Sequence, residues 1–140
     1  MMALAVPKGA EGAGGLEVKV KKASEAKNRD LLAADGIIFG SPTYFGQMSA
    51  RLKAVIDESE KIQKKLTGKV GGAFINSGET ASGGETTLLS IVLAMLIHRM
   101  IVQGRADNTC FGVAVTCAPS KETFLNARNL AETSIHRLKK

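Results

Sequence analysis

The chain has 140 residues, which is the size of a single domain, and its hydrophobic and charged fractions of 44% and 23% are typical of a folded globular protein. A largely disordered chain is excluded. The net charge of +6 favours contact with an anionic partner, but the Lys and Arg residues are spread along the sequence. With no Trp and one Tyr, the chain lacks the interleaved aromatic and basic residues of nucleic-acid-binding proteins, so we expect no nucleic-acid partner.

The sequence also bears on the cellular compartment. The longest apolar run, residues 88–97, is much shorter than the ~20 residues that a membrane-spanning helix needs. The first residues lack the basic region and apolar core of a signal peptide. The two cysteines, Cys110 and Cys117, have no partners at metal-site spacing. We therefore expect a cytoplasmic protein with no membrane partner and no metal.

The first half of the chain predicts two strands separated by helices. Residues 16–20 alternate between apolar and charged, the pattern of a half-exposed strand at a sheet edge. A short helix is expected over 26–34. Residues 36–40 form an apolar run bounded by glycines, which predicts a strand buried on both faces. Ser49 is the expected N-cap of the next helix, and Gly68 marks that helix's end.

The second half continues the alternation of strands and helices. Residues 70–75 predict another buried strand, and 85–98 predict a strongly apolar helix. A polar, glycine-rich loop over 76–84 connects the two. Residues 100–102 predict a third short core strand, and 113–116 predict its continuation after an insertion.

A last helix is expected from Pro119, with Ala127 on its apolar face. Because strands alternate with helices and the central strands are apolar on both faces, we expect a parallel sheet with helices on both sides. The predicted architecture is one α/β domain over 1–140, doubly wound and three-layered.

Ligands of such sheets collect beyond the carboxyl ends of the strands, and two unusual loops are expected there. The first, residues 41–48, carries the aromatic pair Tyr44 and Phe45 and leads directly into a helix. Exposed rings on a loop favour a planar ligand that covers them. The alternative is that both rings pack into the core or into an interface between subunits.

The second loop, residues 76–86, contains hydroxyl side chains and precedes a long helix whose positive end faces the loop. This arrangement suits an anionic or carbonyl-rich ligand. The segment contains neither a Walker motif nor G-x-G-x-x-G. The alternative is a flexible surface loop in which Thr86 belongs to a capping box.

Together and in this order, the two loops resemble those of the flavodoxin-like NAD(P)H:quinone oxidoreductases, also called the Trp-repressor-binding-protein family. Residues 40–48, GSPTYFGQM, are similar to the family's loop G-[ST]-P-T-x-[FY]-G-N-M, which wraps the FMN ring, with Gln47 in place of the family's Asn. Residues 74–86 look like its second flavin loop, and 111–120 look like its last strand and the start of its last helix.

The resemblance implies a flavodoxin-like fold that binds FMN. Thr43, Tyr44 and Phe45 would contact the ring, residues 76–81 would line its pyrimidine side, and His98 would lie near it. Read from the residues alone, His98 is instead expected to end a helix. By position, the implied cofactor-binding residues are Ser41, Pro42, Thr43, Tyr44, Phe45, Gly46, Asn76, Ser77, Gly78, Glu79, Thr80, Ala81 and His98.

The resemblance further implies an oxidoreductase that passes electrons from NAD(P)H through FMN to a quinone or similar acceptor. No catalytic side chain is expected, because the cofactor carries the chemistry. Two alternatives remain open: a flavodoxin-type electron carrier, and a non-catalytic flavodoxin-fold protein that no longer binds FMN. Family members often form dimers and tetramers, and the apolar helix over 85–98 is expected either to be fully buried or to build such an interface.

The beginning of the chain departs from the family pattern. Flavodoxin-like folds begin with a central strand and a Ser/Thr-rich loop that holds the FMN phosphate, whereas residues 1–12 resemble only the end of the family's first helix. Three explanations are open: a longer natural protein, direct pairing of 16–20 with 37–39, or a second chain that covers the gap. With the first strand and phosphate loop missing, we expect FMN binding by this chain to be weak or absent.

Overall fold

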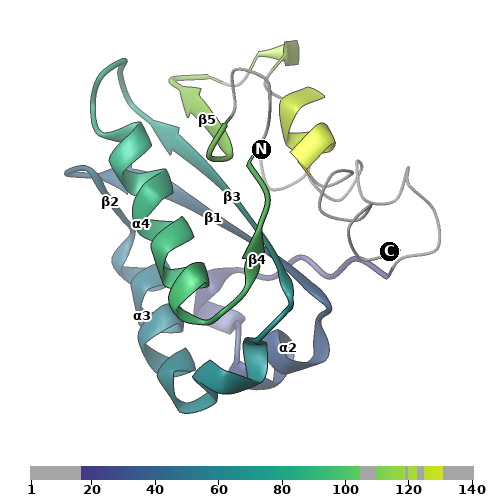
Figure 1. Cartoon of the computed structure of the whole chain (residues 1–140). Helices are drawn as coiled ribbons and strands as arrows, with labels where there is room; N and C mark the ends of the chain where they lie inside the picture. Colours follow the sequence, from purple (N-terminus) through teal and green to yellow (C-terminus); the bar gives the residue numbers. More distant parts are fainter. Residues whose placement is uncertain (1–16, 105–109, 119, 123–124, 131–140) are drawn as a thin grey trace.

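The computed structural model describes residues 17–104, 110–118, 120–122 and 125–130 (Figure 1). Strands and helices alternate along the chain, as the sequence predicts. Residues 121–122 and 125–130 are helical. The other elements, in chain order, are η2 (Ala23–Glu25), α2 (Asn28–Ala33), β1 (Gly36–Tyr44), β2 (Gln47–Met48), α3 (Ala50–Glu58), η3 (Ser59–Leu66), β3 (Val70–Ser77), α4 (Gly84–Ile97), β4 (Ile101–Val102) and β5 (Val113–Thr116).

The sheet is built around β3, which has parallel neighbours on both edges. β1 pairs with β3 along most of its length. On the other edge, β4 pairs with Val70 and Gly71 at the start of β3, and β5 pairs with its last four residues, beginning at Phe74. β4 and β5 therefore lie end to end in one lane of the sheet. This confirms that 113–116 continue the strand begun at 100–102.

The main core lies between one face of the sheet and the helices. Leu31 of α2, Leu52 of α3 and Ile91 of α4 belong to one buried cluster with alternate strand residues, among them Ile37 and Ile75. Successive residues of a strand point to opposite faces of the sheet, so every second residue of each strand contributes to this core. The cluster holds the three helices against the sheet. Of these, α3 follows the β1–β2 hairpin and α4 follows β3, so both begin at the carboxyl ends of the strands.

The opposite face of the sheet also carries buried residues, at β3 and β5. Phe74 points away from the side where Ile75 packs, and its ring lies across Gly40, where a Cβ would stand 2.0 Å from the ring's Cζ. Val113 pairs with Phe74 and is buried, as is Ala127 of the helical residues 125–130. Buried residues thus lie on both faces at β3 and β5, the part of the sheet that matches the expected doubly wound α/β fold.

The expectation of a strand over 16–20 is wrong for the described part of that segment. Residues 17–22 form no strand, and in the described chain no strand flanks 37–39 on the edge of β1 away from β3. An extended segment becomes a strand only where a neighbour shares its backbone hydrogen bonds. This segment is held instead by Lys21, whose Nζ lies 2.7 Å from the Asp30 carboxylate. Leu16 and Pro119 lie outside the described residues.

Two strands are more exposed than expected. In β1, Ile37 is buried, but Ile38 and Phe39 are only half-buried. In the 100–102 strand, Met100 is buried while Ile101 is 50% exposed. Neither strand is therefore covered on both faces. β4 lies at an edge of the described sheet, where side chains have fewer neighbours than in a central strand.

The apolar helix is found within one residue of its predicted bounds, but it is not fully buried. Leu88, Ile91 and Met95 face the core, whereas Leu93 and Ile97 are 57% and 65% exposed. None of the helices in the described ranges is long and apolar enough to cross a membrane. The outer face of α4 is thus an apolar surface without a covering element among the described residues.

Candidate functional site

The segment 41–48, expected as an irregular loop, forms a β-hairpin. β1 continues to Tyr44, and the chain turns at Phe45 and Gly46 into β2, so that Tyr44 pairs with Gln47. Both turn residues have positive φ angles, 51° and 73°. Such angles fit the twist of a two-residue hairpin. The expectation of a loop is corrected here, because Phe at the first turn position is not a residue that signals a hairpin.

The hairpin presents both aromatic side chains to solvent. Tyr44 is 60% exposed and Phe45 is fully exposed, so packing in the core is excluded for both rings. Phe45 also holds a backbone conformation that is rare outside glycine and costs about 1–3 kcal/mol. A strained, exposed aromatic residue at the edge of the sheet where ligands collect is typical of a binding surface.

The residues before the turn have separate roles. The buried Ser41 hydroxyl donates to the Pro42 carbonyl at 2.7 Å and accepts from the Ser49 amide at 2.8 Å, which fastens the hairpin's base to α3. Ser49 caps α3 as predicted, since its side chain accepts from the Leu52 amide. Thr43 differs, because its Oγ1 is buried and has no hydrogen-bond partner among the described residues. A ligand's polar atom at the hairpin would relieve that unmet hydrogen bond.

The second predicted loop starts later than expected, because Asn76 and Ser77 end β3. Asn76 donates from its side-chain amide to the Cys117 carbonyl at 3.0 Å, and the buried Ser77 hydroxyl lies 3.3 Å from the Val115 carbonyl. Both side chains therefore hold the end of β3 to the end of β5. The exposed part of the loop carries the remaining predicted residues, Gly78, Glu79, Thr80 and Ala81.

Cys117 is a contributor that sequence reasoning missed. Its amide donates to the Ser77 carbonyl at 2.8 Å, and its thiol donates to the Gly78 carbonyl at 2.7 Å. The residue follows the strand over 113–116, so it reaches the same carboxyl edge as the two loops. The sequence could have indicated this role, because Cys117 directly follows a predicted strand and therefore lies at its carboxyl end.

The structure brings the two predicted loops together at the first turn of α4 (Figure 1). The backbones touch, since a Cβ on Gly83 would lie 2.5 Å from the Gly46 Cα. Thr86 Oγ1 lies 2.9 Å from the Gly46 carbonyl and 3.0 Å from the Gly83 carbonyl. One turn further along α4, the Ser90 hydroxyl donates to Gln47 Oε1 at 3.2 Å. The hairpin is therefore docked on α4.

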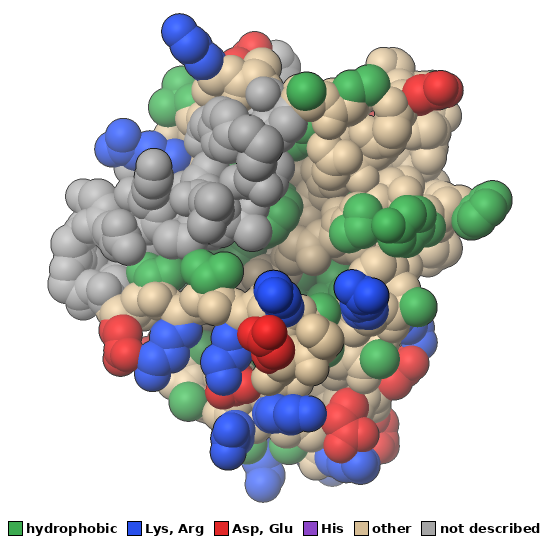
Figure 2. All heavy atoms as spheres, turned by 180° about the vertical axis from the view of Figure 1, so that it is seen from behind, with side chains coloured by type: hydrophobic (Ala, Val, Ile, Leu, Met, Phe, Trp, Pro, Cys, Tyr) green, Lys and Arg blue, Asp and Glu red, His purple; other side chains and the backbone are tan. Residues whose placement is uncertain are grey.

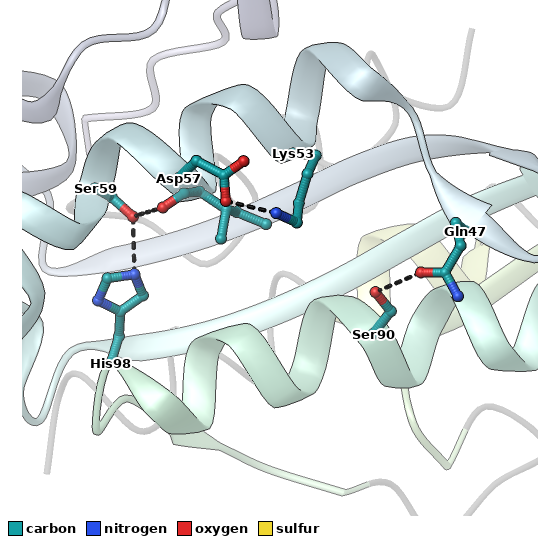
Figure 3. Close-up of polar contacts among 7 residues, drawn as sticks. Gln47, Lys53, Asp57, Ser59, Ser90 and His98 are labelled. Carbon is teal, nitrogen blue, oxygen red and sulfur yellow. Dashed lines mark hydrogen bonds and ion pairs between the residues drawn. The ribbon is translucent and has the colours of Figure 1, made fainter.

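His98 does not join this group. It follows the last residue of α4, a 14-residue helix about 21 Å long, whereas the hairpin contacts the first turns. Its buried ring places Nε2 2.8 Å from Ser59 Oγ, which donates to the Ile56 carbonyl. Figure 3 shows this pair at the other end of α4 from the contact between Ser90 and Gln47. His98 is thus the residue that ends α4, as the sequence predicts when its residues are read without the family resemblance.

The geometry suits the ring of a flavin better than its phosphate. Tyr44 and Phe45 offer exposed faces for stacking, whereas the Thr43 hydroxyl is buried and has to turn outward to reach a ligand. The N-cap of α4, Gly83, has no side-chain cap, so the positive end of the helix faces the loops. Segments 41–48 and 76–86 contain no Lys or Arg. The described residues also hold no cluster of three or more metal-ligating side chains.

Comparison with known proteins agrees with this arrangement. Residues 8–109 match the family described as NADPH-dependent FMN reductase. A NAD(P)H dehydrogenase (quinone) of Archaeoglobus fulgidus is 34% identical over an alignment of 128 residues, and the match covers 82% of this chain and 67% of that protein. An iron-sulfur flavoprotein of Methanocaldococcus jannaschii is 47% identical over an alignment of 95 residues, and the match covers 65% of this chain and 49% of that protein.

A solved structure, that of a WrbA-like flavodoxin from Agrobacterium tumefaciens, matches with a TM-score of 0.78 at 30% identity, covering 99% of this chain and 88% of the other. A flavodoxin from the domain Archaea, at 21% identity and a TM-score of 0.79, shares the fold. The predicted flavodoxin-like α/β fold is thereby confirmed. The chain spans about half to two thirds of the length of the curated relatives.

Proposed function

The chain belongs to the NADPH-dependent FMN reductase family, and on that premise we propose that it binds FMN and acts as an NAD(P)H:quinone oxidoreductase. The observation that carries the proposal is the hairpin whose exposed rings are docked beside the second loop and the start of α4. Both segments resemble the flavin loops of the flavodoxin-like NAD(P)H:quinone oxidoreductases, and they occur in the same order.

The residues of the hairpin and of the second loop bind the flavin ring in two ways in this proposal, by stacking and by hydrogen bonding. Tyr44 and Phe45 stack on the flavin ring and exclude water from it, since an aromatic face in contact with a planar ligand removes apolar area from solvent. Thr43 Oγ1 forms its missing hydrogen bond with a polar atom of the ring. The exposed backbone at Gly78 and Thr80 supplies hydrogen-bonding groups for the ring's pyrimidine side.

The chemistry itself belongs to the cofactor, which when bound accepts a hydride from NAD(P)H and delivers electrons to a quinone. This chain's residues hold and orient the ring, and no side chain of the site has to act as acid or base. Glu79 places a carboxylate on the exposed loop, where it disfavours negative charge on the ring. His98 is left out of the proposal, because it lies at the other end of α4.

We further propose that this chain binds FMN weakly, mainly through the ring. The site segments offer Glu79 and Glu85 but no cationic side chain for the phosphate. Titration with FMN and with riboflavin, which lacks the phosphate, tests this. Because Tyr44 is the single tyrosine and there is no Trp, its emission and the flavin's own emission both report stacking. We expect both flavins to bind, with dissociation constants within about threefold of each other.

The outcomes of this titration separate the parts of the proposal. FMN binding more than tenfold tighter than riboflavin would show a phosphate site and contradict weak binding. If neither flavin changes the tyrosine or flavin emission of the folded chain, the proposed binding site for the ring is contradicted. Once a flavin binds, quinone-dependent oxidation of NAD(P)H supports the oxidoreductase. Flavin binding without such oxidation would instead support the flavodoxin-type carrier.

We also propose that copies of this chain associate through the outer face of α4. The solvent-facing residues of this face are apolar and recur at helical spacing: Leu89, Leu93, Leu96 and Ile97, with Ile101 beyond the helix. A contiguous apolar surface of this kind is typical of an interface between proteins. A dimer or tetramer is therefore expected.

A further inference from the structure

We infer that Thr86 is a positioning residue for the flavin site, acting through the hairpin rather than on the ring; this rests on the function proposed above. Its side chain joins the two loops, because Oγ1 lies 2.9 Å from the Gly46 carbonyl and 3.0 Å from that of Gly83. The hydroxyl proton is shared between two carbonyls that lie on different segments. The residue therefore ties the tip of the hairpin to the first turn of α4.

The hairpin needs such a tether. β2 pairs with β1 through only two residue pairs, Thr43 with Met48 and Tyr44 with Gln47. A two-stranded ribbon this short is marginal by itself. The fully exposed Phe45 contributes no core packing, and its positive φ adds strain. Without an outside contact, the rings would have no preferred orientation.

Two neighbouring contacts act in the same direction. Gly83 allows the backbone of α4's first turn to approach Gly46 so closely that a Cβ would lie 2.5 Å from its Cα. The hydroxyl of Ser90 reaches Gln47 on β2 one turn later. Thr86 lies between them, and its hydroxyl contacts the turn itself through the Gly46 carbonyl.

The first measurement needs no flavin. Because Tyr44 is the chain's single tyrosine and no Trp is present, tyrosine fluorescence anisotropy reports the motion of the hairpin directly. Thr86→Val keeps the side-chain shape and removes the hydroxyl, and we expect the anisotropy to fall. Thr86→Ser keeps the hydroxyl and should restore it. Thr67→Val is the matched control, since the Thr67 hydroxyl, directly after η3, donates to the Lys64 carbonyl of that helix and lies away from the hairpin.

The second measurement is the affinity for FMN. We expect Thr86→Val to weaken FMN binding about three- to tenfold, the range of one net hydrogen bond, and Thr86→Ser to stay near the parent chain. If the parent chain binds no flavin, the proposed function fails, but the anisotropy comparison still decides whether Thr86 holds the hairpin.

An unchanged Tyr44 anisotropy in a folded Thr86→Val variant would overturn the inference. If that variant does not fold, Gly83→Ala tests the same contact from the other side, because the added Cβ forces Gly46 away while Thr86 stays intact. A folded Gly83→Ala chain should then lose anisotropy. Retention of the full value there would equally refute a role for this contact.

Discussion

At the scale of single residues, Glu79 is the charged side chain on the exposed loop between β3 and α4. Glu79 is exposed, and the Ser82 hydroxyl donates to its backbone carbonyl at 2.5 Å. Among the described residues, the Glu79 carboxylate forms no ion pair, so no neighbouring cation there neutralises its charge. A fixed negative charge beside a flavin ring opposes the ring's anionic reduced form.

Glu79→Gln should raise the two-electron midpoint potential of the bound flavin. At about 6 Å in water, the repulsion between two unit charges is about 0.7 kcal/mol, which corresponds to about 15 mV for a two-electron couple. A redox titration of the flavin-loaded chain measures the shift. Glu60→Gln, in η3, removes the same charge elsewhere and should leave the potential unchanged. A lower potential in Glu79→Gln would contradict this placement of the carboxylate.

At the scale of elements, α2 anchors the segment that the sequence predicts as an edge strand. Asp30 accepts from the Lys27 amide at 2.9 Å and pairs with the Lys21 ammonium at 2.7 Å. The hydrogen bond from Lys21, followed by that from Lys27, lowers the pKa of the Asp30 carboxyl from its ordinary value of 3.8. One side chain thus stabilises the start of α2 and ties residues 17–22 to it.

Asp30→Asn should lower the melting temperature slightly at neutral pH, and the difference from the parent should vanish in acid. The lowered pKa means that the folded state binds the proton less readily than the unfolded state. The contribution is therefore present above pH 3.8 and is lost as the pH falls through the folded-state value. Thermal unfolding at several pH values measures this. Lys21→Met should reduce the effect of Asp30→Asn, and fully additive losses would exclude coupling between the two side chains.

At the scale of the whole molecule, most ion pairs and the exposed apolar residues of the candidate site lie on different elements. Figure 2 shows Lys, Arg and acidic side chains gathered over the half of the molecule built by α2, α3 and η3. Three ion pairs are found there, the closest joining Lys53 and Asp57 at 2.5 Å. The hairpin and α4 instead expose Tyr44, Phe45 and Leu93. The two loops of the candidate site contribute no Lys or Arg to the net charge of +6.

Leu93→Gln should shift the parent assembly toward monomers. Leu93 is 57% exposed in the middle of the apolar face of α4, so the change does not disturb the core but adds a polar group to the proposed interface. Sedimentation velocity measures the mass distribution of both chains. Leu32→Gln on α2, at 37% exposure, is the control and should keep the assembly. A monomeric parent chain would contradict the proposed association.

Much of the fold is readable from the sequence because it is recorded in local periodicity. Apolar runs place β1 and β3, and helical spacing places α4 within one residue at each end. The helix predicted from Ser49 to Gly68 begins as expected, but α3 ends at Glu58 and the chain continues to Leu66 as the 3-10 helix η3. Ser49 as N-cap is likewise a local signal. The prediction of a strand over 16–20 is wrong because alternating apolar and charged residues indicate only which side chains prefer burial. A strand also requires a neighbouring strand that shares its backbone hydrogen bonds.

The sequence by itself determined the α/β class, the alternation of strands and helices after residue 26, the family and the two segments that form the candidate site. Tertiary structure alone decided that 41–48 is a hairpin, that both its rings face solvent and that His98 lies apart from them. The contacts of Thr86 with Gly46 and of Asn76 with Cys117 join residues about forty positions apart. Local sequence patterns indicate which side of a helix or strand is apolar. The partners of Thr86 and Asn76 depend instead on how the helices and strands pack against one another.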